Sequence, residues 1–145
     1  MPHSFVKIWI HAIWATKERQ SLIKSSVESL IHEYMHSQFI ELGCPARIIN
    51  GMPDHIHCLF QLSREKSIAD VIKQVKGSCS YFVNEQNLIV EKFAWQTGYA
   101  AYSVSESQLG KVFQYIKNQK THHAKKSFAD EYNEFLKLYG FEEQE

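Results

Sequence analysis

Alternating and clustered hydrophobic residues divide the chain into strands separated by polar turns. Residues 5–15 (FVKIWIHAIWA) are rich in β-branched and aromatic side chains, which indicates a buried strand. Residues 46–50 (ARIIN) and 55–62 (HIHCLFQL) have the same character and are separated by the turn-forming residues 51–54 (GMPD). Residues 99–104 (YAAYSV) make a fourth candidate. We therefore expect four strands, with the second and third joined as a hairpin.

Apolar residues at helical spacing occupy the segments between and after these strands. Ser67 with Asp70 three residues later is typical of a capped helix start. The last helix should end at Gly140, because glycine readily terminates helices. The four helices are expected at about residues 25–42, 68–82, 105–122 and 127–139.

The order of these elements is β-α-β-β-α-β followed by two helices. This order predicts an α+β, ferredoxin-like fold, with an antiparallel sheet, helices on one face and two additional C-terminal helices. The other face of the sheet must then be covered or used. Because 145 residues contain no repeat, low-complexity tract or linker, we expect one domain over residues 1–145.

Composition favours a folded intracellular protein. Hydrophobic residues make up 44% and charged residues 22% of the chain, which argues against disorder. The three cysteines form no CxxC pair, so we expect reduced thiols in the cytoplasm. There is no signal-peptide pattern, and no apolar run approaches the ~20 residues needed to cross a bilayer.

The net charge does not favour binding of nucleic acid by electrostatic attraction alone. The formal net charge is +0, whereas nucleic-acid-binding domains are usually basic. Acidic residues concentrate from Asp130 onward, however, so the rest of the chain is net basic. We interpret this acidic stretch, which includes Glu131, as a solvated helix and a frayed end.

His55-Ile56-His57 is the first candidate for chemistry. Alternate side chains on a strand share a face, so both imidazoles should point to one side, about 7 Å apart along the strand. They could bind one metal ion, or they could be two polar positions on a half-buried strand. A histidine-triad nucleotide hydrolase needs a third histidine where Leu59 stands, and no second His-x-Thr/Ser motif supports a two-histidine phosphoesterase.

Tyr115 and Gln119 are the second candidate. They stand four residues apart, so they lie one turn apart on the same side of a helix. Tyr115 falls beside the apolar stripe of that helix, where a structural tyrosine is also common. A tyrosine hydroxyl titrates near pH 10 and is a weak nucleophile unless a metal ion stabilises the charge that builds on the attacked phosphate. A site of two imidazoles and one amide oxygen suits Mn²⁺, and Mg²⁺ could serve with retained waters.

With both motifs in this order, the chain resembles the single-tyrosine HUH (His-hydrophobic-His) transposases of small bacterial insertion sequences, including their REP-associated branch. The resemblance covers nearly the whole chain. The matching pieces are His11 with Trp14, Lys17-Glu18-Arg19, residues 52–60 (MPDHIHCLF), 71–80 (VIKQVKGSCS), 93–105 (FAWQTGYAAYSVS) and 115–123 (YIKNQKTHH).

The resemblance implies a ferredoxin-like enzyme that nicks and joins single-stranded DNA carrying hairpins. It implies that Tyr115 attacks a phosphodiester to form a 5′-phosphotyrosine link, and that His55, His57 and Gln119 bind the divalent metal. Asp54 would orient a ligand histidine. It also implies homodimers with joined sheets, in which the tyrosine helix of one subunit can complete the metal site of the other.

Basic residues are candidates for contacts with DNA. Lys17, Arg19 and Arg47 stand at strand ends and could contact a hairpin, or could be plain surface charge. Lys73 and Lys76 lie on the polar side of a helix, where they could follow a single strand or form a solvated face.

Other histidines have simpler structural interpretations. We expect His11 on the first strand to be a buried, hydrogen-bonded histidine. His122-His123 suits the C-terminal end of a helix, where the dipole favours positive charge.

Two alternatives to a mobile-element transposase remain open from the sequence. A host-adopted relative would use the same chemistry on dispersed palindromic repeats. A non-catalytic ferredoxin-like module would bind nucleic acid or metal without cutting, although it would have no need of the Tyr115/Gln119 pair.

Overall fold

The four strands form one antiparallel sheet in the order β2-β3-β1-β4, and helices pack on it. The computed structural model describes residues 4–123 and 126–138. The strands are β1 (Trp9–Ala15), β2 (Ala46–Met52), β3 (His55–Gln61) and β4 (Ala100–Val104). The helices of the described residues are α1 (Glu28–Glu41), α2 (Ile68–Glu85), α3 (Leu109–Lys117), α4 (Gln119–His122) and α5 (Phe128–Leu138), with short 3-10 turns at η1 (Lys17–Arg19) and η2 (Glu106–Gln108).

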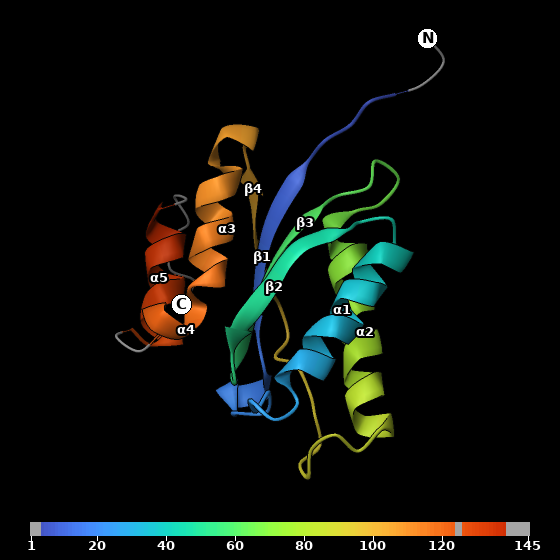
Figure 1. Ribbon diagram of the computed structural model, residues 1–145, viewed down its shortest axis with the longest axis vertical. Helices are drawn as coiled ribbons and strands as arrows, with labels where there is room; N and C mark the ends of the chain where they lie inside the picture. The colour runs from blue at the N-terminus through green and yellow to red at the C-terminus, as the bar shows by residue number, and fades with distance from the viewer. Residues whose placement is uncertain (1–3, 124–125, 139–145) are drawn as a thin grey trace.

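The sheet is the middle of three layers. Helices α1 and α2 cover one face, and α3, α4 and α5 gather on the opposite face (Figure 1). The predicted ferredoxin-like order is confirmed, and the C-terminal helices cover the face that the two crossover helices leave open. No helix in residues 4–123 and 126–138 has the length and apolar character to cross a membrane.

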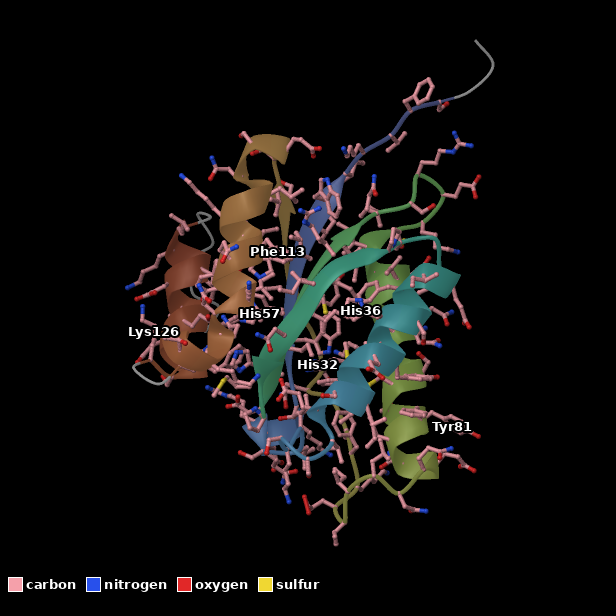
Figure 2. The ribbon with its side chains drawn as sticks, in the orientation of Figure 1. His32, His36, His57, Tyr81, Phe113 and Lys126 are labelled. Atoms are coloured by element: carbon pink, nitrogen blue, oxygen red, sulfur yellow. The ribbon has the colours of Figure 1, made fainter. Side chains whose placement is uncertain are left out.

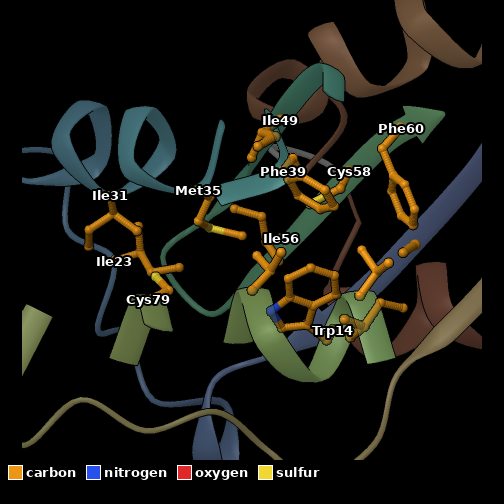
Figure 3. Packing of buried hydrophobic residues seen from close by; sticks show 14 of the residues in the cluster. Trp14, Ile23, Ile31, Met35, Phe39, Ile49, Ile56, Cys58, Phe60 and Cys79 are labelled. Carbon is orange, nitrogen blue, oxygen red and sulfur yellow. The ribbon is translucent and has the colours of Figure 1, made fainter. Parts of the chain in front are cut away.

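The main hydrophobic core lies between the sheet and the α1/α2 layer. Trp14 of β1 and Ile56 and Cys58 of β3 point into it, where they meet Met35 and Phe39 of α1 (Figure 3). These side chains are fully or almost fully buried. Because strand side chains alternate, the residues between them must face α3–α5.

The central strands pair in a register that sets the second face. Ala12 lies opposite Cys58, and the next pair is Ile13 opposite His57. Ile13 belongs to a second apolar cluster, in which Phe128, Tyr132 and Phe135 of α5 pack against β1 and β4. The histidines of β3 are thereby enclosed between the sheet and the C-terminal helices.

The boundaries of β1 and of the helix expected at 105–122 differ from the expectations. β1 begins at Trp9 rather than Phe5, because Trp9 is the first residue paired with β3 and β4, whereas Phe5 and Ile8 are exposed. The helix expected at 105–122 is divided into η2, α3 and α4, with a break at Asn118 (φ −94°, ψ 18°). The expected end at Gly140 lies outside the described residues. The Ser67 cap is confirmed, since its side chain accepts a hydrogen bond from the Asp70 amide.

Gly51 permits the tight β2–β3 hairpin that leads into the histidines. A β-carbon on Gly51 would lie 2.2 Å from the carbonyl oxygen of His55 and 2.9 Å from the α-carbon of Ile56. Both are backbone atoms, so neither can move away without displacing β3.

Gly51→Ala is therefore expected to lower the free energy of unfolding by about 1–3 kcal/mol or more, the usual cost of overpacking. Chemical denaturation measures the change. Gly77→Ala in α2 is the matched control, because a β-carbon there meets nothing within 4 Å and should stabilise the helix by about 0.5–1 kcal/mol. Equal stability of the two variants would contradict the close approach at Gly51.

Candidate metal and nucleophile site

His55 and His57 lie fully buried on the face of β3 that α3–α5 cover. Ile56 between them points into the opposite core, as the alternation predicts. Figure 2 shows His57 on the side of α3–α5, whereas His32 and His36 lie on the side of α1. The two imidazole rings are 5.2 Å apart between centroids, close enough for both to face one shared ligand.

His11 of β1 orients His57. Its Nε2 lies 2.8 Å from Nδ1 of His57, and the two rings stack. Burial, and secondarily the neighbouring His57, holds the pKa of His11 well below its usual range, so His11 is neutral. The contact occupies Nδ1 of His57 and directs Nε2 toward α5. The buried, hydrogen-bonded His11 expected from the sequence is confirmed, and its partner is a site histidine.

Asp54 orients His55 in a similar way. Nδ1 of His55 lies 2.8 Å from Oδ1 of Asp54, so Nδ1–H donates and Nε2 faces the interior. Burial alone would lower the pKa of His55, but its hydrogen bonds to Asp54 and Glu131 outweigh burial and the pKa is raised. Asp54 is itself held at the turn, because its carbonyl accepts a hydrogen bond from the Thr16 amide at 3.0 Å.

Tyr115 on α3 and Gln119 on α4 reach the same histidines. The Tyr115 ring lies 5.8 Å from the His57 ring, between centroids. Gln119 is fully buried, and its Oε1 lies 3.1 Å from Nε2 of His55. One chain thus brings together the four residues that the sequence singled out from two distant motifs.

Asn50 of β2 joins the tyrosine helix to the hairpin. Its side-chain amide donates to the carbonyls of Ile116 and Lys117 at 2.9 and 3.2 Å, where α3 ends. The Lys120 ammonium in turn donates to Asn50 Oδ1 and to the Gly51 carbonyl. These bonds attach the carbonyl end of α3 and the start of α4 to β2, and they hold Tyr115 and Gln119 close to β2 and β3.

Glu131 of α5 occupies the centre of the cluster, which the sequence interpretation missed. It was expected on a solvated helix, yet it is 1% exposed. Its Oε1 lies 3.0 Å from Nε2 of His57, 3.5 Å from Nε2 of His55 and 3.0 Å from Nε2 of His123. Its Oε2 accepts hydrogen bonds from the Tyr115 hydroxyl and from Gln119 Nε2. Burial alone would raise the pKa of Glu131, but hydrogen bonds to His55 and His57 lower it overall.

The spacing of apolar residues along α5 could have indicated that Glu131 is buried. Phe128, Tyr132 and Phe135 stand at helical spacing and pack against β1 and β4. Glu131 falls within that stripe, three residues after Phe128 and four before Phe135. An acidic residue inside an apolar stripe is a candidate for a buried role. His123, interpreted as a helix-end residue, also belongs to the cluster rather than to the solvent.

The cluster has the donors that a divalent metal requires. One ligand atom from each of His55, His57, His123 and Glu131 can be chosen so that all lie within 4.8 Å of one another. Three imidazole nitrogens and a carboxylate, with the Gln119 amide oxygen close by, form a mixed nitrogen and oxygen set of the kind that first-row divalent ions accept. The residues present therefore fit a divalent metal ion.

A pocket of about 580 Å³ opens beside this cluster. Its rim includes Arg19, whose guanidinium lies 5.9 Å from the centroid of the Phe128 ring. Glu18 and Arg19 both adopt left-handed backbone angles, with φ of 56° and 54°, which is unusual for residues other than glycine. Lys17 next to them is exposed. Aromatic and polar residues line the pocket, among them Trp14, Gln96, Tyr99, Phe128 and Tyr132.

The other basic candidates lie apart from one another. Arg47 is exposed at an irregularity in the β2–β3 pairing, and Lys73 is exposed on α2. The Lys76 ammonium donates to the carbonyls of Gln96 and Gly98, so it supports the segment that precedes β4. Contacts between these three residues and DNA stay predictions.

Comparison with known proteins finds a matching family model and a similar transposase. The family model described as "Transposase IS200 like" matches residues 4–119. The ISDra2 transposase TnpA of Deinococcus radiodurans is 25% identical over 114 residues, which is 75% of this chain and 81% of that protein.

Solved structures agree with the fold. A Deinococcus radiodurans R1 crystal structure described as that of a transposase aligns with a TM-score of 0.65 at 25% identity, over 82% of this chain and 96% of that one. A REP-associated tyrosine transposase bound to a REP hairpin aligns with a TM-score of 0.62 at 12% identity, over 85% of this chain and 73% of that one.

Asn50→Ala tests the attachment of the tyrosine helix. The variant removes two bonds to helix-end carbonyls, so the free energy of unfolding should fall by about 1–2 kcal/mol, and amide hydrogen exchange in α4 should accelerate. Gln114→Ala, at an exposed position on α3, is the control and should change stability by less than about 0.5 kcal/mol. Unchanged exchange in α4 would show that Asn50 does not hold this segment.

Proposed function

The chain belongs to the IS200-like transposase family, and we propose that it cuts and rejoins single-stranded DNA with Tyr115 as nucleophile and a divalent metal ion at His55, His57 and Gln119. One observation carries the proposal. The Tyr115 side chain lies in the same buried cluster as both histidines and the glutamine, within one chain.

The residues that would hold the metal are oriented for that task. Asp54 and His11 each occupy Nδ1 of one site histidine, which leaves both Nε2 atoms facing the cluster. Gln119 presents its carbonyl oxygen toward His55. When bound, Mn²⁺ or Mg²⁺ supplies a positive charge that stabilises the phosphate oxygens during attack.

Tyr115 would attack the phosphorus of a phosphodiester. A bond forms between the tyrosine oxygen and phosphorus while the bond from phosphorus to the 3′ oxygen breaks. The tyrosine loses its proton, and the departing 3′ oxygen gains one. The products are a 5′-phosphotyrosine link and a free 3′-hydroxyl, with the number of phosphodiester bonds conserved.

Rejoining is the reverse reaction with a different strand end. A 3′-hydroxyl attacks the phosphotyrosine link, which releases Tyr115 and seals the DNA. No nucleotide cofactor is needed, because the covalent link preserves the energy of the original bond. The α3–α4 attachment through Asn50 keeps Tyr115 at the metal ligands through both steps.

Hairpin-bearing single-stranded DNA is the substrate that fits the surroundings of the site. The pocket beside the cluster combines Arg19 with exposed and half-buried aromatic rings, which suits base stacking and phosphate contact. The REP-associated relative is bound to a hairpin of this general kind. Lys17 stands at the same end of β1 and could contact the backbone.

Excision and insertion of a small mobile element is the use we propose for this chemistry, in line with the ISDra2 transposase relative. A host-adopted relative acting on dispersed palindromes would use the same residues, and the surrounding genome distinguishes the two. A homodimer stays a prediction. Within one chain, the Tyr115 ring lies next to the His57 ring, so the nucleophile and this histidine could come from the same chain of a dimer.

Tyr115→Phe tests the nucleophile. Incubation of the wild-type protein with labelled hairpin DNA and Mn²⁺ should give a covalent adduct that survives denaturation. The variant should lose the adduct and at least about 1,000-fold of cleavage, because phenylalanine offers no oxygen. Tyr81→Phe, on an exposed tyrosine of α2, is the matched control and should retain both. An adduct that persists without the Tyr115 hydroxyl would assign the attack to another residue.

His57→Ala tests the metal ligand separately from DNA binding. Cleavage should fall by about 100-fold or more, since the site loses a ligand, while hairpin affinity should change little. His36→Ala, on the α1 side of the sheet, should leave both unchanged. Parallel loss of cleavage and hairpin binding in His57→Ala would instead favour a structural histidine and a non-catalytic binding module.

A further inference from the structure

Glu131 lies outside the part of the chain that matches the family, yet it contacts every residue of the proposed site. The family match ends at residue 119, and Glu131 follows on α5. Its carboxylate is buried among three imidazoles, one amide and the Tyr115 hydroxyl. An inaccessible carboxylate is costly unless positive charge or hydrogen bonds compensate it, so its position calls for a role.

The two oxygens of Glu131 face different partners. Oε1 faces the imidazole nitrogens of His55, His57 and His123. Oε2 faces the Tyr115 hydroxyl and the Gln119 amide. A single carboxylate therefore bridges the metal-binding side of the cluster and the nucleophile.

We propose that Glu131 is a ligand of the divalent metal through Oε1 and positions the Tyr115 hydroxyl through Oε2, with His123 as a further nitrogen ligand. The proposal rests on the metal site of the proposed function and adds to it a carboxylate and an imidazole from the C-terminal helices.

The spacing of the ligand atoms supports this assignment. Neighbouring ligands at about 2.1 Å from one metal ion in octahedral or tetrahedral geometry stand about 3.0–3.4 Å apart. Oε1 of Glu131 lies 3.0 Å from His57, 3.0 Å from His123 and 3.5 Å from His55. Oε1 of Glu131 therefore stands at, or within about 0.1 Å of, the separation of a neighbouring ligand from each of the three imidazole nitrogens.

His123 is oriented as a nitrogen ligand must be. Its Nδ1 meets the carbonyl oxygen of Lys126, which can only accept, so Nδ1 carries the proton and donates it. Nε2 is then the atom turned toward Oε1 of Glu131. This arrangement repeats the one at His55, where Asp54 accepts from Nδ1.

Aromatic packing holds Glu131 in place from both sides along α5. Phe128 stacks on the His55 ring at 4.2 Å, and the Phe135 ring lies 5.3 Å from the Tyr115 ring, between centroids. These contacts anchor the helix turns before and after Glu131. A carboxylate also adds the anionic oxygen that Mn²⁺ and Mg²⁺ favour, which the neutral set of His55, His57 and Gln119 lacks.

Mn²⁺ binding to the DNA-free protein tests the proposal directly. Titration calorimetry, with the electron paramagnetic resonance signal of free Mn²⁺ as a second readout, measures the dissociation constant. Glu131→Gln keeps the shape but removes the charge, and we expect it to weaken Mn²⁺ binding at least about 10-fold. Asp130→Asn, at the exposed position directly before Glu131 on α5, is the matched control and should bind Mn²⁺ as the wild type does.

Two further variants keep the test decisive. Glu131→Asp retains the charge but shortens the side chain, so it should bind Mn²⁺ more weakly than the wild type even if Glu131→Gln fails to fold. His123→Gln should also bind more weakly.

The outcomes separate this inference from the proposed function. If Glu131→Gln binds Mn²⁺ as tightly as the wild type while His57→Ala does not, Glu131 is no ligand but the proposed metal site stands. If Glu131→Gln binds Mn²⁺ more tightly and cleaves faster, the carboxylate competes with the substrate phosphate, and the inference is overturned. If the wild type binds no Mn²⁺, the metal site of the proposed function fails with it.

Discussion

Strand β3 carries the hydrophobic core on one face and the proposed chemistry on the other, and the rest of the structure depends on that alternation. Ile56 and Cys58 are buried against α1 and α2, which fixes the strand in register with β1. His55 and His57 are consequently forced to the opposite face. A one-residue slip of β3 would bury both imidazoles in the apolar core. The packing that stabilises the fold therefore also determines which way the two histidines point.

The C-terminal helices turn these histidines into an enclosed cluster. The break at Asn118 separates α3 from α4, and Asn50 binds the carbonyls at that break, so Tyr115 and Gln119 are attached to the strands that carry the histidines. Helix α5 then closes the cluster through Glu131. Tyrosine, metal donors and carboxylate come from four separate elements, and their geometry depends on the docking of each.

Local periodicity was enough to predict much of this arrangement. The sequence order of the strands and the shared face of His55 and His57 follow from repeats of two or about four residues. The break at Asn118, which puts Tyr115 on α3 and Gln119 on α4, does not follow from such repeats. The buried position of Glu131 was not predicted, because it depends on how α5 packs across the sheet, and no local repeat encodes that contact. Composition was misleading as well, since the acidic C-terminal stretch suggested solvent exposure for a side chain that is buried.

Peptide mapping of the covalent protein–DNA complex tests the central claim most directly. Single-stranded hairpin DNA and Mn²⁺ would be used to trap the complex, which is then digested with trypsin and nuclease and analysed by mass spectrometry. The account predicts a nucleotide 5′-phosphate on Tyr115, in the peptide of residues 112–117 (VFQYIK). Attachment to Tyr102 or Tyr132, which lie on the same side of the sheet, would contradict it.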